Sequence, residues 1–360
     1  MHKLPLLLLA ALLCTSLAAQ DDYERWRDSV EESWRGYEQQ MDDAYLSYKR
    51  HIERIWAEFV DSTPSTWVEY GPQKSVRSAV DFEQGTLELA TVLPADTPNP
   101  QQAAQERLRL QLTRVVREAD DTGTPLLQDQ LCAPDGNLVT PDNVEQEAQA
   151  LVQAPEARNI TTPEGPKLLY TVRLELVPDH LQERAGRYLP DILAFCQRFE
   201  IPAPLAMGVI HTESHFNPRA INRSTGACGL MQIIPRYAGV TMNRILHDDP
   251  RQPTTEELYD PRRNLEMGIG YLHYLDIHYF ADIRSMRSRY YAIIAAYNGG
   301  AGNVYRTFSG QNRHSDEFDK IVNDLKDEDV FLRLTGSHPY GETRRYLIKV
   351  TSRAEDYGGL

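Results

Sequence analysis

The sequence predicts two folds in succession, an α+β domain in the first half of the chain and a mostly helical domain in the second. Apolar and polar residues alternate with a period of two over much of residues 67–93, which is typical of strands with one buried face. From about residue 178 onward, apolar residues recur at helical spacing instead. The chain has 360 residues, which is enough for two such domains.

The first residues are typical of an export signal. His2 and Lys3 precede an unbroken apolar run, Leu6–Leu13, and small residues follow that run. The run is too short to span a bilayer, and a cleavage site near Ala18 suits the small residues. We therefore predict a signal peptide over residues 1–19.

Cys14 gives the same segment a second interpretation, as a lipoprotein cysteine that is acylated after cleavage. Leu13 stands where lipoprotein processing prefers a small residue, which argues against acylation. Both interpretations of this segment stay open at the level of the sequence.

The composition narrows the classes of function. The net charge is −14 at pH 7, which disfavours a nucleic-acid partner because phosphate binding requires a basic surface. No His/Cys cluster has the spacing of zinc ligands, so we expect neither a metal nor a cofactor. Three cysteines follow the predicted signal peptide, an odd number that allows at most one disulfide within the chain: Cys132, Cys196 and Cys228.

Residues 20–177 are predicted to form the α+β domain. A three-four rhythm of apolar residues over Asp21–Phe59 indicates one long amphipathic helix, or two. The segments predicted as strands are Trp67–Tyr70, Ser78–Phe82, Thr86–Leu93 and Leu168–Val177. The other segments predicted as helices are Gln101–Ala119 and Val144–Val152. This half contains no recognisable catalytic cluster.

Residues 178–360 are predicted to form the helical domain. Its first helix is expected over Leu181–Phe199, with an inward face made of Leu189, Ile192, Leu193 and Cys196. Further segments predicted as helical are Asn264–Leu275, Tyr290–Gly302 and Gly341–Leu347.

A short helix between Pro202 and Pro218 carries the main candidate catalytic residue. Proline suits a helix start, and Pro218 disfavours helical geometry in the residue before it. Glu213 follows Val209 by four residues and Ile210 by three, so it lies on the apolar face of this helix. Loss of water there raises the pKa of a carboxyl toward the range of a general acid. A partly buried, paired structural glutamate is the alternative interpretation.

Four short motifs and a linking segment then carry a family resemblance. They are, in chain order, Glu213–Ser214, Gly229–Gln232, Asp260–Asn264 with Gly268 and Tyr271–Leu272, Ala296–Gly300, and Glu342–Thr343 with Tyr346. Together they resemble the lytic transglycosylases of the soluble-lytic type, bacterial murein-cleaving enzymes with a goose-type lysozyme-like fold. The resemblance covers roughly residues 185–355. The first half, particularly residues 70–92, resembles the amino-terminal domain of a membrane-bound member of that family.

The resemblance implies a lyase that cleaves the β-1,4 bond between N-acetylmuramic acid and N-acetylglucosamine and leaves 1,6-anhydromuramyl ends. Its substrate would be the glycan strands of peptidoglycan, and Glu213 would act first as acid and then as base. The protein would work in the periplasm or cell envelope of a Gram-negative bacterium, with Cys14 as an outer-membrane anchor if it is acylated. Asp260 and Glu342 lie in segments that look structural, so we expect no second catalytic carboxylate.

The other site residues are carried over from the same motifs. Tyr297 is expected to direct its hydroxyl at the substrate N-acetyl oxygen or at Glu213, with a core tyrosine as the alternative. The residues expected to bind substrate are Ser214, Met231, Gln232, Tyr271, Asn298 and Tyr346. Met231 would form an apolar floor for a sugar ring, or else belong to the core. We expect His211 and His215 at the surface or rim of the site.

Two alternatives to a lytic transglycosylase stay open. A true lysozyme would add water and leave reducing ends, and a non-catalytic scaffold would bind peptidoglycan without cleaving it. A further interpretation is compatible with a lytic transglycosylase: the aromatic amino-terminal half would bind a protein partner in the envelope.

Overall fold

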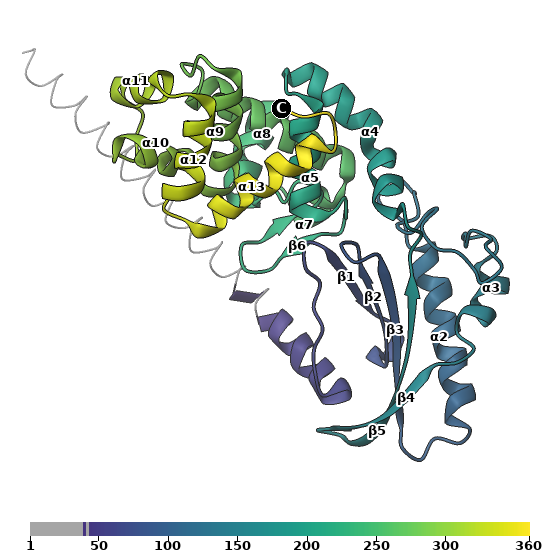
Figure 1. Cartoon of the computed structure of the whole chain (residues 1–360). Coiled ribbons are helices and arrows are strands. Elements are labelled where there is room, and N and C mark those ends of the chain that lie inside the picture. The colour runs from purple at the N-terminus through teal and green to yellow at the C-terminus, as the bar shows by residue number, and fades with distance from the viewer. Residues whose placement is uncertain (1–38, 41–42) are drawn as a thin grey trace, which may run out of the picture. The chain divides into compact units, whose positions relative to one another are not determined.

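The computed structural model describes residues 39–40 and 43–360 of the chain (Figure 1). The predicted signal peptide, Cys14 and the first half of the predicted helix Asp21–Phe59 lie outside these residues, and residues 43–56 are helical. The chain divides into two compact units. One contains the described residues up to Phe59 together with Ile160–Pro166, and the other contains Val60–Asn159 with Lys167–Leu360. In the described part of the chain, no helix has the length and apolarity needed to cross a membrane.

An antiparallel sheet of five strands lies in the first half of the fold, and four of these strands were predicted. The strand order is β1-β2-β3-β5-β4. The strands are β1 (Thr66–Tyr70), β2 (Val76–Asp81), β3 (Thr86–Pro94), β4 (Glu156–Thr162) and β5 (Gly165–Glu175). A short 3-10 helix, Pro72–Lys74, connects β1 and β2. Strand β4 was not predicted, because it is an edge strand whose residues are mostly exposed and polar and so show no alternation.

Two helices complete the core of this α+β region. They are α2 (Pro100–Arg117) and α3 (Val144–Leu151), and both begin and end within two residues of the predicted bounds. Helix α2 packs on β2, β3 and α3. Its buried Leu108, Leu112 and Val115 join Leu87 and Leu89 of β3 in one hydrophobic core. The period of two gives the strand one apolar face, the period of 3.6 gives the helix another, and these two faces pack together.

The second half of the chain is helical, which confirms the predicted class. Its helices are α4 (His180–Phe199), α5 (Ala203–Ser214), α6 (Val240–His247), α7 (Thr255–Tyr259), α8 (Pro261–Tyr279), α9 (Met286–Gly299), α10 (Ala301–Ser309), α11 (Asp316–Asp324), α12 (Asp327–Ser337) and α13 (Gly341–Glu355). A two-stranded ribbon, β6 (Ile221–Asn222) and β7 (Ala227–Cys228), and a π-helical turn, Pro235–Gly239, lie between α5 and α6.

Helix α5 lies inside this helical region and packs on α4 and α13 (Figure 1). Residues 205–210 are all buried, as expected for a helix that is covered on every side. Gly208 permits the closest contact, because a Cβ atom there would lie 2.8 Å from the carbonyl oxygen of Val350 in α13. Helix α13 is therefore held directly against the helix that carries Glu213.

The inward face of α4 differs from the prediction at two positions. Ile192 and Cys196 are buried as expected, but Leu189 and Leu193 are 38% and 49% exposed. The buried residues of α4 are Arg184, Ala185, Tyr188, Ile192, Phe195, Cys196 and Phe199. Leu189 and Leu193 each follow a member of this stripe by one residue, which turns them about 100° away from it.

Candidate active site

A cleft of about 860 Å³ opens at the carboxyl end of α5. Its walls come from the end of α5, the β6–β7 ribbon, residues 232–238, α8, the end of α9 and one face of α13. Pro64, just before β1, also lines the cleft, so the sheet region contributes to its wall. Of the sequence-predicted site residues, Glu213, Gln232, Tyr271, Tyr297, Asn298 and Tyr346 line this cleft.

Glu213 lies in the last turn of α5 and faces this cleft. Loss of water on burial raises the pKa of its carboxyl to about 7, and the negative charge of Glu342 adds to that rise. The hydroxyl of Tyr346 donates a hydrogen bond of 2.7 Å to Oε1 of Glu213, which acts in the opposite direction. At neutral pH this carboxyl can therefore both give and accept a proton.

The tyrosine that contacts Glu213 is Tyr346 and not Tyr297. Tyr297 donates its hydroxyl to the carbonyl oxygen of Met231 at 2.7 Å. Burial raises the pKa of both tyrosines well above 10, so both remain protonated donors at neutral pH. The sequence interpretation gave the Tyr297 hydroxyl either to the substrate N-acetyl oxygen or to Glu213. The structure gives the hydrogen bond with Glu213 to Tyr346 of α13, and the contact with the N-acetyl oxygen stays a prediction.

Two of the expected substrate-binding side chains lie behind the cleft wall. Ser214 is fully buried and donates its hydroxyl to the carbonyl oxygen of Leu230 at 2.7 Å. Met231 is fully buried against α8, where a Cβ atom on Gly268 would lie 2.2 Å from its sulfur. Met231 therefore belongs to the core of the helical region, which is the alternative that the sequence left open.

Gln232 offers the cleft an unused acceptor. Its Nε2 donates to the carbonyl oxygen of Gly229 at 3.0 Å, whereas its buried Oε1 has no hydrogen-bond partner among the described residues. A buried amide oxygen without a donor costs free energy, and a hydroxyl or N–H of a bound sugar would remove that cost.

Two other predicted residues line the cleft with their polar groups partly engaged. Asn298 accepts a hydrogen bond of 2.6 Å from the hydroxyl of Thr343 in α13. Tyr271 stacks on Tyr274 and meets the ring of Tyr297 edge to face, with centroids 6.0 and 5.7 Å apart. These contacts connect the middle of α8 with α9, and the end of α9 with the start of α13, at the cleft.

Sequence reasoning missed two kinds of cleft residue. Tyr237 and Tyr340 are aromatic rings that are 61% and 54% exposed, a setting in which rings commonly contact ligands. Arg345 and Lys349 line the cleft from α13. Their spacing from Tyr346 and Glu342 along one helix face was a signal that could have identified them.

The two carboxylates that looked structural in the sequence have different positions. Asp260 caps α8, where its side chain accepts a hydrogen bond from the backbone N–H of Arg263 at 3.1 Å. Glu342 is exposed and lines the cleft, and no ion pair holds it among the described residues. Glu342 is therefore the one carboxylate besides Glu213 among the described residues of the cleft lining.

The histidines on either side of Glu213 support α5 from behind. His215 is 8% exposed, so the expectation of a surface or rim position was wrong for it. Arg353 of α13 donates to the His211 carbonyl at 2.8 Å and contacts Nε2 of His215 at 3.0 Å. Burial first, and then the nearby arginine, lower the pKa of His211 to about 4 and that of His215 to about 3. Both rings are neutral at neutral pH.

A buried arginine joins the sheet region to the same helix end. Arg184 of α4 is 1% exposed, and its guanidinium donates to the carbonyl oxygens of His215 at 3.0 Å and Phe82 at 2.8 Å. It also donates to Oε1 of Gln130 at 2.6 Å. His215 has a left-handed backbone with φ of 53°, so Arg184 holds the strained residue that ends α5.

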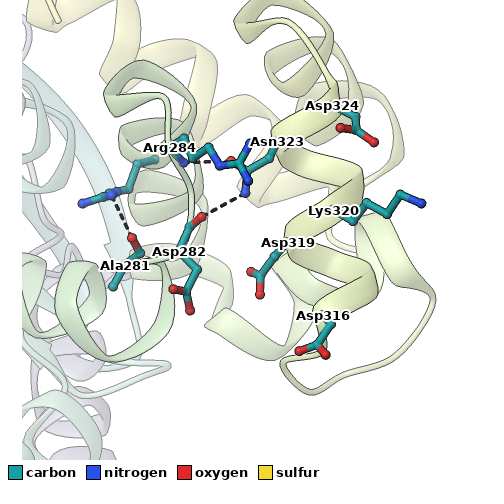
Figure 2. A pocket seen from close by; sticks show the side chains of 9 residues that line it. Ala281, Asp282, Arg284, Asp316, Asp319, Lys320, Asn323 and Asp324 are labelled. Atoms are coloured by element: carbon teal, nitrogen blue, oxygen red, sulfur yellow. Dashed lines mark hydrogen bonds between the residues drawn. The ribbon is translucent and has the colours of Figure 1, made fainter.

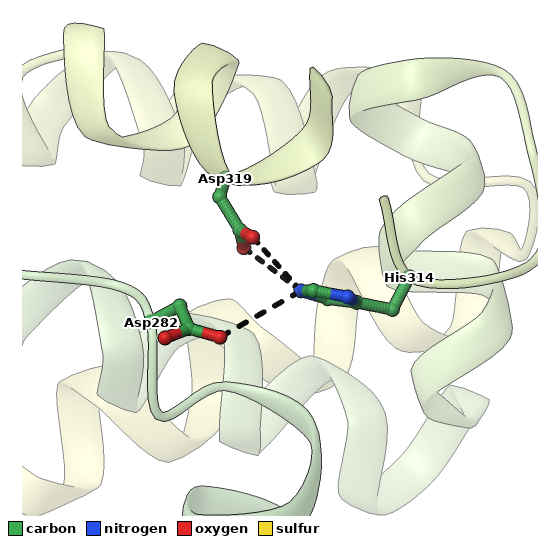
Figure 3. Close-up of side chains that lie close together, drawn as sticks. All are labelled: Asp282, His314 and Asp319. Atoms are coloured by element: carbon green, nitrogen blue, oxygen red, sulfur yellow. Dashed lines mark hydrogen bonds and ion pairs between the residues drawn. The ribbon is translucent and has the colours of Figure 1, made fainter. Parts of the chain in front are cut away.

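Outside the cleft, three side chains are close enough together to hold a metal ion. Figure 3 shows the side chains of Asp282 and Asp319 directed at the ring of His314. Nε2 of His314 lies 2.9 Å from Oδ2 of Asp319 and 3.9 Å from Oδ2 of Asp282. The two aspartates also line a pocket of about 620 Å³ with Arg284 and Lys320 (Figure 2). The group is largely exposed, and the hydrogen bond between the His314 ring and Asp319 is enough to explain its geometry.

The cysteines of the described residues are Cys132, Cys196 and Cys228, and all three are free thiols. Cys228 is buried beside the cleft wall, and burial raises its pKa to about 11. It is therefore protonated and unreactive at neutral pH.

The fold and the cleft together define a class of protein, and comparison with known proteins identifies that class. Residues 192–319 match the transglycosylase SLT domain family. Over 330 residues the chain is 33% identical to membrane-bound lytic murein transglycosylase C of Yersinia pestis (strain Pestoides F), covering 86% of this chain and 87% of that protein. The same values hold for the protein of that name from Yersinia pseudotuberculosis serotype O:1b (strain IP 31758). The chain therefore belongs to the membrane-bound lytic murein transglycosylase C family, and it is an enzyme of the lyase class.

Two solved structures are similar over part of the chain. One is the soluble lytic transglycosylase of 70 kDa from Escherichia coli, 27% identical with a TM-score of 0.36, covering 50% of this chain and 25% of that one. The other is an inactive mutant of the lytic transglycosylase Slt from Pseudomonas aeruginosa. It is 24% identical with a TM-score of 0.35, and the match covers 48% of this chain and 24% of that one.

Proposed function

We propose that this enzyme cleaves the β-1,4 bond between N-acetylmuramic acid and N-acetylglucosamine in peptidoglycan, with Glu213 as its single acid and base. The observation that carries the proposal is the position of the Glu213 carboxyl, which is partly buried, lines the cleft, has a pKa of about 7 and accepts a hydrogen bond from a neutral phenol. A general acid is most effective when its pKa lies near the working pH.

In the first step, protonated Glu213 gives its proton to the glycosidic oxygen while the C1–O bond breaks. The N-acetyl group of the muramyl residue stabilises the positive charge that develops at C1, as in other substrate-assisted glycoside cleavages. N-acetylglucosamine leaves with the proton on its new hydroxyl, and Glu213 becomes a carboxylate.

In the second step, the Glu213 carboxylate takes the proton of the C6 hydroxyl on the same muramyl ring. The C6 oxygen forms the new bond to C1, which closes a 1,6-anhydro ring and restores protonated Glu213. The nucleophile belongs to the substrate, so this bond forms within one molecule and benefits from a high effective concentration.

The remaining cleft residues support this chemistry. Tyr346 holds the Glu213 carboxyl in one orientation, and Tyr297 fixes the Met231 carbonyl next to Gln232. Oε1 of Gln232 and the amide of Asn298 are suited to sugar hydroxyl and N-acetyl groups.

Hydrolysis is the second candidate, because Glu342 supplies another carboxylate to the cleft. A lysozyme-type reaction would use Glu342 to activate water or to attack C1.

Mass spectrometry of products from purified sacculi separates the two reactions. Anhydro ends, lighter than reducing ends by one water molecule, are expected from the native enzyme and from Glu342→Gln. Reducing ends that disappear in Glu342→Gln would establish hydrolysis instead.

The cellular setting follows from the family and stays a proposal. A membrane-bound relative favours a location in the Gram-negative envelope, with outer-membrane association through an acylated Cys14. We also propose that the α+β domain ends at residue 177 and that the helical domain begins at residue 178. A protein partner in the envelope that binds the first domain is a further proposal. Labelling with a palmitate analogue, compared between the native protein and Cys14→Ser, tests the anchor.

A further inference from the structure

One face of α13 lines the cleft and carries two cations. Residues 342, 345, 346 and 349 are spaced at i, i+3, i+4 and i+7, which places them on the same side of the helix, and all four line the cleft. Tyr346 is fixed by its hydrogen bond to Glu213. At 1.5 Å per residue, Arg345 and Lys349 lie within about one helical turn of that contact along the helix axis.

Both cations are available for a ligand. Arg345 and Lys349 are exposed, and neither forms a side-chain hydrogen bond or ion pair with any residue that the structure describes. Two neighbouring cations of α13 are engaged: Arg344 with the carbonyl oxygens of Gly336 and His338, and Arg353 with α5.

The charge of the cleft differs from that of the whole chain. The chain has a net charge of −14. Two glutamates and two cations line the cleft among the described residues: Glu213, Glu342, Arg345 and Lys349. Burial keeps Glu213 largely neutral below pH 7, so the two cations outnumber the one remaining carboxylate, Glu342. An anionic group that enters the cleft would therefore meet a locally positive wall.

We propose that Arg345 and Lys349 bind the carboxylates of the stem peptide on the muramyl residue that is being cleaved. The inference rests on the proposed function, because Glu213 then fixes which ring lies beside α13. N-acetylated sugars carry no charge, whereas the lactyl group of that ring carries a peptide with free carboxylates. Arginine can hold a carboxylate with two parallel hydrogen bonds, and lysine adds a mobile point charge.

The position of the two cations favours a peptide carboxylate over an anionic membrane surface. Both side chains line a concave cleft whose walls also include the β6–β7 ribbon and Tyr271. A flexible polymer can enter such a cleft, but a flat layer of lipid headgroups cannot.

The test compares two substrates that differ only in the peptide. Soluble glycan strands that carry stem peptides are prepared, part of the sample is stripped of peptide with an amidase, and the lactyl carboxylate that the amidase leaves is capped as its neutral methyl amide. In the double variant Arg345→Met/Lys349→Met, which keeps the apolar stems and removes both charges, kcat/KM on peptide-bearing strands is expected to fall about tenfold. On stripped strands it should change less than twofold.

Two control variants sharpen this comparison. Arg345→Lys/Lys349→Arg keeps both charges and is expected to retain the preference for peptide-bearing strands. Lys320→Met removes an exposed cation of α11 that lines the separate pocket and not the cleft. This variant should leave kcat/KM unchanged on both kinds of strand. Added salt should weaken the preference of the native enzyme and leave the double variant unaffected.

A binding measurement keeps this proposal separate from the proposed mechanism. Dissociation constants for both kinds of strand are measured in a Glu213→Gln background, with and without the two Met substitutions. A loss of affinity confined to peptide-bearing strands supports the peptide site, whatever the products of the native enzyme prove to be. An equal loss on both strands, or no loss on either, overturns the peptide site.

Discussion

Two partly buried glutamates, one in the sheet region and one in the helical region, have opposite surroundings. Burial raises the pKa of both Glu69 and Glu213. Glu69 of β1 forms an ion pair with Arg114 of α2, and that positive charge opposes the rise. The nearest partner of Glu213 is a neutral tyrosine, and a second carboxylate increases the rise. The sheet region therefore compensates a buried acid, whereas the cleft keeps its acid ready to exchange a proton.

The largest expected difference between the two acids is in activity. Glu213→Gln keeps the shape of the side chain and removes the proton, so turnover of purified sacculi should fall by a factor of roughly 10² to 10⁴. Glu69→Gln, the matched control in β1, should leave turnover within about twofold. Turnover is measured by release of soluble muropeptides, and substantial activity in Glu213→Gln would remove this residue from its role.

The second expected difference is in stability as a function of pH. The folded pKa of Glu213, about 7, lies above the unfolded value of 4.5, so the folded state loses stability as pH rises between these values. The loss amounts to about 3 kcal/mol at most. Glu213→Gln abolishes it, so the gain in unfolding free energy over the native enzyme should be larger at pH 8 than at pH 4. Urea unfolding at the two pH values measures this, and a pH-independent difference would contradict a raised pKa.

The contact between the two regions can be tested with two arginines of α4. Arg184→Met leaves the buried carbonyl oxygens of Phe82 and His215 without their donor, which should cost about 3 kcal/mol of unfolding free energy. Arg187 binds carbonyl oxygens of the segment Pro125–Gln128 and does not touch α5, so Arg187→Met should cost about 1 kcal/mol.

Turnover distinguishes support of the active site from general stability. In conditions where both arginine variants are folded, kcat should fall several-fold in Arg184→Met and stay nearly native in Arg187→Met. Equal kcat values in the two variants would show that the sheet region does not influence the end of α5.

The smallest expected effects concern the two tyrosines of the cleft. Tyr346→Phe removes a hydrogen bond that lowers the pKa of Glu213, so the alkaline limb of the kcat/KM profile should move to higher pH. Tyr297→Phe leaves the Met231 carbonyl without its donor, which should cost about 1 kcal/mol of stability and leave the position of that limb unchanged. A shift in Tyr297→Phe and none in Tyr346→Phe would reverse the assignment made from the structure.

Much of the local structure could be predicted because it depends on short-range patterns. The alternation in residues 86–93 predicted β3, and the prolines at 202 and 218 bracketed α5. Helical spacing also placed Glu213 on the apolar side of its own helix. Strand β4 was missed for the same reason, because a polar edge strand has no pattern to detect.

The order of the motifs and the face of Glu213 follow from the sequence by itself, since chain order and helical period are local properties. Tertiary packing decided which side chain meets Glu213. Tyr346 is 133 residues away, and the close approach at Gly208 that brings α13 against α5 has no periodic signature. The same packing buried Met231 and His215 and turned Arg345 and Lys349 into the cleft. A residue's own helix sets the direction of its side chain, but its partner depends on how distant helices fit together.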